Sequence, residues 1–383
     1  MIYYLALFLL VVFSFAEFCG IQKIYAVKKY SLDKIVFIYI AFFLFCIAAF
    51  RYKTGRDWTG YIYYFNNCLA KKSSFNFESG FALLNKFFKK NFDSFYLMQF
   101  CTMIFCCYCT YKSFLKRSAY PVFTLFLYFT MFFLQTDMAQ TRQHIAMAII
   151  LCGMQFIENK KIILWCLIVL LAMQFHITAL LAFPLYFTTN RKISVRFCIV
   201  LFIASVFITF FGLNIIRSML ALITKLSIVP ERIRIIGNSY LNSKIYGQQG
   251  QFGSGLGFLV RYAFIALMIF FYELISKKSD ASNYYFLNFF IALVFQAMGR
   301  NFDQFSRIAN YYLICGSGLC AYNLLLDAKK FFRKTEVLKI AMCTVFVLFM
   351  LYNFYNLWTV PSKHFNSYKM DYTPYRSFIF ESN

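Results

Sequence analysis

The stretch IILWCLIVLLAMQFHITALLAFPLYFT, residues 162–188, decides the fold class because it contains no charged side chain. About 20 apolar residues cross a bilayer as a helix. The pairs Lys160–Lys161 and Arg191–Lys192 border the stretch, and such basic pairs mark the cytoplasmic ends of spans. One span would put the two pairs on opposite sides of the membrane. We therefore predict two short helices that meet near His176, at the outer side.

The composition of the whole chain agrees with a membrane protein. Of 383 residues, 61% are hydrophobic, 22% are aromatic and 14% are charged, and the mean hydropathy is +0.61. Soluble domains carry about 25% charged residues. The net charge of +24 lies in short basic clusters between apolar runs, as in topology-setting cytoplasmic loops. These numbers exclude a soluble enzyme, a disordered protein and a nucleic-acid-binding domain, and they predict membrane lipid as a partner, with no nucleic acid.

Apolar runs recur along the whole chain. We predict an all-α, polytopic integral membrane protein with about 12 transmembrane helices, some short or broken, in a single domain over residues 1–383. Long outer-face loops are expected at about 51–93 and 214–255, with an outer-face tail at 359–383. The predicted spans are roughly 2–20, 35–50, 94–111, 119–134, 144–157, 162–175, 177–188, 197–213, 256–274, 284–298, 308–326 and 337–358.

The segment 51–93 conflicts with the simplest charge rule. It carries eight Lys and Arg residues against three acids, yet the alternation of spans puts it outside. Either the topology differs locally, or the positive charge serves a task. Within it, Phe81, Leu84 and Phe88 follow helical spacing, which predicts an amphipathic helix on the membrane surface.

Metal and cofactor motifs do not occur in the sequence. The thirteen cysteines fall almost entirely in apolar runs, where cysteine behaves as a small hydrophobe. There is no HExxH, paired CxxC, GxSxG or DxD pattern. We therefore predict no metal site and no cofactor.

Ionisable residues at the ends of spans are candidates for function in a membrane protein. The first group follows Arg51, where Asp57 and Tyr61 would share a helix face next to Trp58. Carboxylates bind sugar hydroxyls, and aromatic rings stack on sugar faces. The alternative is an interfacial aromatic belt with basic residues that extend to the headgroups.

A second group stands at the mouth of a predicted span, where Asp137 precedes Arg142, Gln143 and His144. Arginine binds phosphate in a bidentate manner, and Arg142 has no basic neighbour that would mark topology. The alternative is a capped helix start with a solvated arginine.

Three further places complete the candidates. His176 could be a general base at neutral pH or a hydrogen-bonded core residue. If helical, Arg300, Asp303 and Arg307 share one face, which could hold a diphosphate or form a structural ladder of ion pairs. Tyr375 lies in the tail and carries little information alone.

The order of these pieces resembles the EpsG/Wzy family of polysaccharide polymerases. Each piece is short, but together they extend over nearly the whole chain. The matching pieces are RYKTGRDWTGYIYYF (51–65), FNFESGFALLNKFF (75–88), TRQHIAMAI (141–149), AMQFHITALL (172–181), FSRIANYY (305–312) and TPYR (373–376).

The resemblance implies a metal-independent glycosyltransferase at the periplasmic side of the bacterial cytoplasmic (inner) membrane. Such enzymes join undecaprenyl-diphosphate-linked oligosaccharide units into O-antigen or a related surface polysaccharide, beside a chain-length regulator and a flippase. A departing diphosphate needs cations, and a sugar hydroxyl needs a base. The expected roles are base for His176, Glu78 or Asp57, diphosphate binding for Arg142, Arg300, Arg307 and Arg51, and sugar binding for Trp58, Tyr61, Gln143 and Tyr375.

Two other functions remain open at this stage. An O-antigen ligase would use the same donor with a different acceptor, and sequence patterns do not separate the two. A lipid-linked oligosaccharide flippase would carry charges along its whole path, whereas the polar candidates here crowd one face. The resemblance favours the polymerase.

Overall fold

The structure of the protein is a computed structural model. It divides into two compact units, residues 1–186 with 319–383 and residues 187–318, and each is described by itself. The described residues are 2–19, 26–27, 30–55, 57–70, 77–188, 193–226, 229, 231–242, 259, 262–263, 265–266, 268–270, 272, 280–299, 303–321, 347–348, 350–351 and 375–380.

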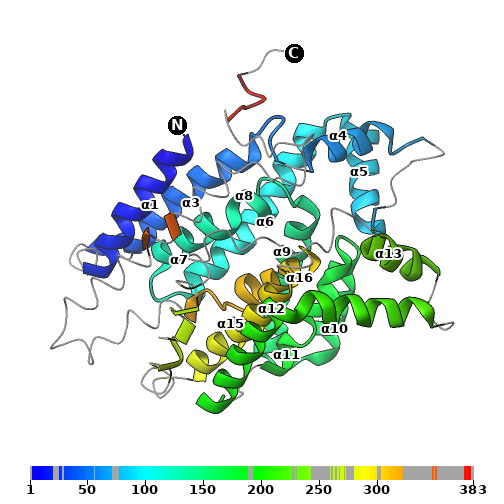
Figure 1. Ribbon diagram of the computed structural model, residues 1–383. Coiled ribbons are helices and arrows are strands. Elements are labelled where there is room, and N and C mark those ends of the chain that lie inside the picture. The colour runs from blue at the N-terminus through cyan, green and yellow to red at the C-terminus, as the bar shows by residue number, and fades with distance from the viewer. Residues whose placement is uncertain are drawn as a thin grey trace. The chain divides into compact units, whose positions relative to one another are not determined.

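The first unit consists of helices and one small antiparallel strand pair, in which Val27 faces Tyr30 (Figure 1). Its elements are α1 (Ile2–Cys19), β1 (Ala26–Val27), β2 (Tyr30–Ser31), α3 (Leu32–Ala49), α4 (Trp58–Asn67), α5 (Ser79–Phe92), α6 (Phe95–Arg117), α7 (Pro121–Tyr128), the π-helical η1 (Phe129–Phe133), α8 (Leu134–Thr136), α9 (Thr141–Glu158), α10 (Ile162–Met173), the 3₁₀ helix η2 (Ile177–Ala182) and α11 (Leu185–Thr188), which ends at the boundary between the units.

Local sequence explains where several of these helices begin. Ser94 caps α6, since its hydroxyl accepts from the Leu97 N–H at 3.2 Å, as serine commonly does at this position. Pro121 starts α7, where its missing N–H costs nothing. The carboxylate of Glu17, at the end of α1, accepts from Phe123 N–H at 3.0 Å. The Glu17 contact thus fixes the start of α7 beside the end of the first helix.

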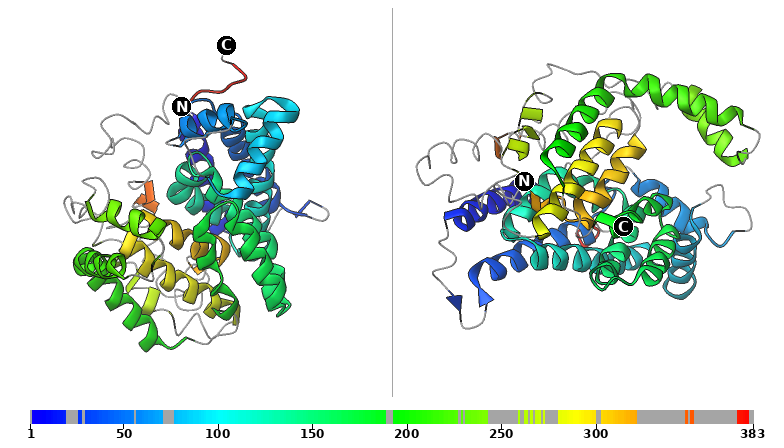
Figure 2. Two further views of the ribbon diagram at one scale, coloured as in Figure 1. Left: turned by 90° about the vertical axis from the view of Figure 1, so that its right-hand side faces the viewer. Right: turned by 90° about the horizontal axis from the view of Figure 1, so that it is seen from below.

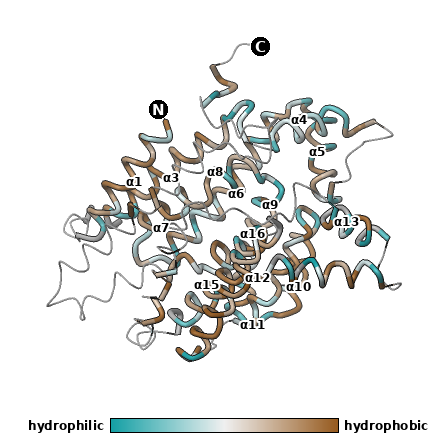
Figure 3. The backbone as a smooth tube through the Cα atoms, viewed as in Figure 1, coloured by the Kyte–Doolittle hydropathy of each residue, from teal (hydrophilic) through white to brown (hydrophobic). Residues whose placement is uncertain are grey.

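The helices of the first unit pack in two groups that share α6. In the first group, α1, α3 and α7 contact one another, and α6 contacts α3 and α7. In the second group, α6 contacts α9. Figure 2 shows this arrangement from two further directions. Hydrophobic colour runs along most of α1 and α3, whereas α4 and α5 are mixed (Figure 3). These mixed helices stand between two longer ones in the chain, since α4 follows α3 and α5 precedes α6.

The break predicted in the stretch 162–188 is confirmed. The helix α10 ends at Met173, and η2 begins at Ile177 after a short turn that contains His176. The predicted amphipathic helix is present as α5, which buries Phe81 and Phe88. Its place on a membrane surface stays a prediction.

The second unit contains α12 (Val195–Lys225), α13 (Glu231–Asn242), α15 (Asp280–Gly299), α16 (Asp303–Asn310) and the π-helical η3 (Tyr311–Cys315). The predicted outer loop at 214–255 is therefore helical in much of its described part. Gly212 does not end α12, because one interior glycine costs only about 1 kcal/mol and the helical hydrogen bonds continue past it. The predicted span 337–358 lies almost entirely outside the described residues.

Two helices in the described part of the chain are long and apolar enough to cross a membrane. They are Leu32–Ala49 and Val195–Gly212, and both fall on predicted spans. Shorter apolar helices occupy four further predicted spans, at Ile2–Glu17, Pro121–Thr136, Ile162–Met173 and Ile177–Thr188. The all-helical class is confirmed, and the number of twelve spans stays a prediction.

Candidate active site

An ion pair joins two segments that the sequence analysis singled out separately. Nη1 of Arg142 donates to Oε2 of Glu78 at 2.6 Å. Glu78 stands immediately before α5, and Arg142 is the second residue of α9. The two side chains are 20% and 21% exposed. The pair is thus short and largely, though not completely, shielded from solvent.

Aromatic side chains complete the surroundings of Arg142. Its Cζ lies 4.3 Å from the centre of the Phe77 ring, which is cation–π geometry. The Tyr61 hydroxyl interacts with the guanidinium and lies 3.4 Å from Oδ2 of Asp57. Burial and the nearby Asp57 raise the pKa of Tyr61 to about 12. Tyr61 therefore keeps its proton at neutral pH and remains a hydrogen-bond donor beside Arg142.

The charge state of Arg142 follows from the same neighbours. Burial lowers the pKa of Arg142, while Tyr61 and Glu78 raise it, and the net direction is upward. The guanidinium is therefore cationic at any physiological pH. Its Nε is buried and has no hydrogen-bond partner among the described residues. The site holds one permanent positive charge with donor capacity beyond the pair with Glu78.

The helix break at His176 docks onto the same place. The carbonyl of Gln174 accepts from Gly80 N–H at 2.8 Å and from Phe81 N–H at 3.2 Å. The N–H of Ile177 approaches Oε1 of Glu78 at 3.4 Å. A Cβ on Gly80 would lie 2.8 Å from Gln174, so only glycine allows this approach. Backbone groups freed by the break are thus bonded to the start of α5, so the break does not leave them without partners.

His176 itself is 6% exposed. Its Nδ1 is 2.5 Å from the hydroxyl of Thr178, which fixes the plane of the ring. The structure therefore joins Glu78, Arg142, Tyr61 and Asp57 in one chain of side-chain contacts, and the backbone on either side of His176 meets Glu78 and the start of α5. The sequence analysis had placed these five residues in four separate pieces.

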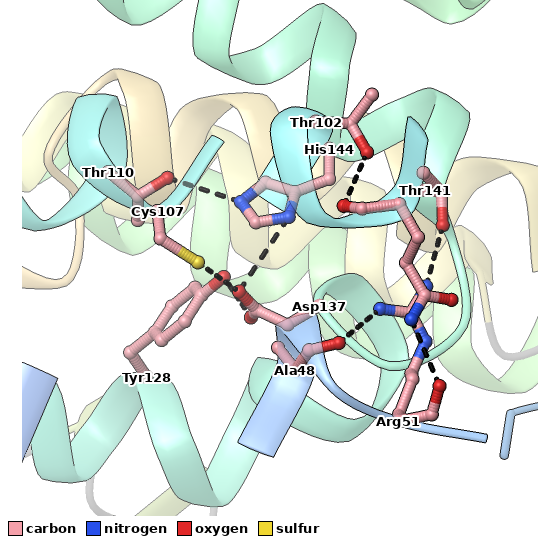
Figure 4. Close-up of polar contacts among 10 residues, drawn as sticks. Ala48, Arg51, Thr102, Cys107, Thr110, Tyr128, Asp137, Thr141 and His144 are labelled. Carbon is pink, nitrogen blue, oxygen red and sulfur yellow. Dashed lines mark hydrogen bonds and ion pairs between the residues drawn. The ribbon is translucent and has the colours of Figure 1, made fainter. Parts of the chain in front are cut away.

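Arg51 is placed differently from Arg142. Its side chain is 2% exposed. Nη1 donates to the Ala48 carbonyl at 2.7 Å, and Nη2 donates to the Thr141 hydroxyl at 3.0 Å (Figure 4). The sequence analysis expected it to bind a diphosphate, but a buried guanidinium with internal partners does not face a ligand here. Arg51 is thus an internal residue that joins the end of α3 to the start of α9.

A second buried cluster surrounds Asp137, which is fully buried. Tyr128 donates to its Oδ2 at 2.5 Å, and Sγ of Cys107 lies 3.6 Å from its Oδ1. Nδ1 of His144 is also 3.6 Å from Oδ1, which is ion-pair range but too long for a hydrogen bond. The other ring nitrogen of His144 is 3.3 Å from the Thr110 hydroxyl (Figure 4). The sequence shows Asp137 and His144 near Arg142, but not that they face inward.

The predicted sugar-binding residues are mostly enclosed. Trp58 is 4% exposed and packs edge-on against the rings of Tyr52 and Phe95. Gln143 is 1% exposed. Tyr375 donates to the Ile47 carbonyl at 3.1 Å, which closes the end of α3. Their role in sugar binding stays a prediction, with Tyr61 the member of this set that lies beside Arg142.

Two predicted arginines remain. Arg300 is outside the described residues. Arg307 lies in α16, within the second unit. The part of the chain that the structure describes holds no group of three or more His, Cys, Asp or Glu side chains arranged to bind a metal ion.

Sequence comparison assigns the chain to a family. The family model of the EpsG family matches residues 34–377, which includes every residue of the Glu78–Arg142 contacts. The chain belongs to the EpsG family. EpsG proteins are membrane proteins associated with polysaccharide polymerase-type glycosyl transfer. No curated protein and no solved structure shows significant similarity to the chain.

Proposed function

We propose that this EpsG-family protein polymerises lipid-diphosphate-linked oligosaccharide repeat units at the outer face of the bacterial cytoplasmic membrane. An acceptor sugar hydroxyl forms the new bond to the anomeric carbon of the growing chain. The bond from that carbon to the diphosphate oxygen breaks, and undecaprenyl diphosphate leaves. The hydroxyl proton passes to a base. The product is an O-antigen or a related surface polysaccharide, and a flippase and a chain-length regulator would work beside the enzyme.

The ion pair of Arg142 with Glu78 is the observation that carries this proposal. Negative charge develops on the leaving diphosphate in the transition state, and a fixed cation in a dry site stabilises it. Arg142 is such a cation, and Tyr61 adds a protonated hydroxyl beside it. A planar guanidinium also matches phosphate oxygens in a bidentate manner. Diphosphate would take the place that Glu78 now occupies.

His176 is our choice for the base. Glu78 already accepts from Arg142 and from the Ile177 N–H, and Asp57 lies beside the Tyr61 hydroxyl. The ring of His176 is oriented by Thr178 and sits at the break that contacts α5. An imidazole can take a proton near neutral pH. Asp57 would then bind sugar hydroxyls, and Glu78 would hold the guanidinium only until the diphosphate displaces it.

The test is a gel of surface glycolipid from a strain without this gene, beside strains that carry wild-type or variant copies. Single-repeat glycolipid in the deletion strain, and a restored ladder with the wild-type gene, supports a polymerase. Glycolipid with no repeat unit in the deletion strain contradicts it and points to a ligase or a flippase. His176→Ala should give the single-repeat pattern at a normal protein level, and a full ladder would remove His176 from the mechanism.

A further inference from the structure

The turn between Asp137 and Arg142 is held from two sides by buried polar groups. On one side, Asp137 is bonded by Tyr128 from α7 and contacted by Cys107 from α6. His144, one turn into α9, faces the same carboxylate. Figure 4 shows these side chains converging on Asp137 from three elements. The start of the turn is therefore fixed to the helices behind it.

On the other side, Arg51 fixes the end of the turn. Its Nη2 donates to Thr141, the residue immediately before Arg142. The side chain of Gln99 in turn donates to the carbonyls of Ala49 and Arg51, each at 2.9 Å. The Arg51 backbone and guanidinium are thus both held, so the contact with Thr141 has a rigid support.

Close backbone packing adds a third restraint. Gly55 has a φ of +96°, and a Cβ there would lie 2.0 Å from the Met138 carbonyl oxygen. The loop that follows Arg51 therefore lies directly against the turn. This loop leads into α4, which carries Tyr61 to Arg142. The contact between Gly55 and Met138 thus helps to set the positions of both Tyr61 and Arg142.

We propose that Arg51, through Thr141, and Asp137, held by Tyr128 and Cys107 at the start of the turn, form a positioning network that aims the Arg142 guanidinium at the diphosphate. The inference rests on the proposed function of Arg142. Recognition of a diphosphate by a guanidinium depends on direction, and small displacements of a positioned group cost much activity. Successive helix residues point about 100° apart, so Thr141 can face inward to Arg51 while Arg142 faces the site. The network touches no ligand and acts through Arg142.

The test compares two substitutions at Thr141, one that keeps the shape of threonine and one that keeps its hydroxyl. Thr141→Val removes the hydroxyl that accepts from Arg51, and Thr141→Ser keeps it. The affinity of each purified protein for inorganic pyrophosphate is measured by calorimetry in detergent, together with the apparent Tm. We expect about five- to tenfold weaker binding for Thr141→Val, less than the full loss of a hydrogen bond to a charged donor, because the lost bond acts on the ligand only through Arg142. Thr141→Ser should bind like wild type.

Thr130→Val is the matched control. Thr130 is fully buried, and its hydroxyl bonds only to carbonyls of its own helix among the described contacts. It should lower the Tm about as much as Thr141→Val and leave pyrophosphate binding unchanged. Equal losses of binding in the two valine variants would mean a general packing defect and would overturn the network.

Arg142→Ala distinguishes a failure of the positioning network from a failure of the proposed role of Arg142. If it loses pyrophosphate binding while Thr141→Val binds like wild type, the positioning network is wrong and the proposed function stands. If Arg142→Ala binds like wild type, or if the wild-type protein does not bind pyrophosphate, the role of Arg142 is wrong. The network that acts through Arg142 then fails with it.

Discussion

Arg142 and Glu78 are 64 residues apart in the chain, yet the guanidinium donates to the carboxylate at 2.6 Å. Each belongs to a different predicted outer segment, and the contact joins the start of α9 to the start of α5. A charged pair that is about four-fifths buried is not needed for helix packing, because apolar residues of similar volume often stabilise equally well. The pair is better explained by a ligand that replaces one of its members.

Loss of the Arg142 charge should abolish polymerisation. We expect Arg142→Ala to reduce polymer about 100-fold or more, as removal of a transition-state donor does. Arg142→Lys should also fail, because an ammonium does not offer bidentate geometry. The measurement is the length distribution of surface polysaccharide in the complemented deletion strain.

Arg117→Ala is the matched control for this prediction. Arg117 pairs with Glu158 at 3.0 Å between α6 and α9, at the other end of α9 from Arg142. Glu158, the partner of Arg117, lies about 24 Å along α9 from Arg142. This variant should keep full-length polymer. If it loses polymer as Arg142→Ala does, the effect of Arg142 is one of stability.

Removal of the Glu78 charge should tighten the binding of a diphosphate. Glu78 competes with phosphate oxygens for Arg142, and glutamine has the same shape without the charge. We expect Glu78→Gln to bind inorganic pyrophosphate about three- to tenfold more tightly than wild type. Glu158→Gln, at the Arg117 pair, should bind like wild type. Weaker binding in Glu78→Gln would mean that Glu78 holds Arg142 in place instead of competing with the ligand.

The helix break at His176 could be predicted from sequence, whereas the buried cluster could not. The break follows from basic pairs at both ends of one apolar run, which is a one-dimensional pattern with a single simple solution. The surroundings of Asp137 come from side chains 9 and 30 residues away, Tyr128 and Cys107. Neither differs in sequence from an ordinary apolar core residue, so no local pattern marks them as partners.

The same limit applies to Arg51 and Arg142. Both are arginines at the end of an apolar helix, and the sequence analysis gave both the same role. The difference arises from tertiary contacts, because Arg51 meets Thr141 and the end of its own helix, while Arg142 meets Glu78. Spacing along a helix gives the face on which a residue lies. It does not say whether that face meets protein or solvent.

Glycine at position 55 should be essential for the shape of the site. Gly55→Ala introduces a Cβ 2.0 Å from the Met138 carbonyl oxygen at a backbone φ of +96°. Strain of this kind costs about 1–3 kcal/mol, and the turn before Arg142 would have to move. We expect a lower apparent Tm and loss of polymer.

Gly60→Ala is the control, since a Cβ at Gly60 meets nothing within 4 Å, and alanine in a helix should stabilise by about 0.5–1 kcal/mol. If Gly55→Ala behaves like Gly60→Ala, the close approach to Met138 is not needed.

Asp137, in the turn between two predicted spans, should make stability depend on pH. Burial raises its pKa to about 7, against the opposing effects of hydrogen bonds from Tyr128 and Cys107 and of the charge of Arg51. A carboxyl in the unfolded chain titrates near 3.9. Between about pH 4 and pH 7 the folded protein therefore holds a proton that the unfolded chain has released. Stability contributed by this group falls as pH rises through that window and is constant above it, by about 4 kcal/mol at most.

Two variants test the sign of this effect. Asp137→Asn removes the titrating group, so the Tm of this variant minus the Tm of wild type should increase from pH 5 to pH 8. Tyr128→Phe removes a hydrogen bond that lowers the pKa of Asp137, so the fall in stability should extend to higher pH than in wild type. Other titrating groups are common to all three proteins and largely cancel in the comparison, apart from His144, which faces the same carboxylate. Parallel Tm curves for wild type and Asp137→Asn would show that Asp137 does not change its charge in this range, and the charge of Arg51 would then keep the buried carboxylate ionised throughout.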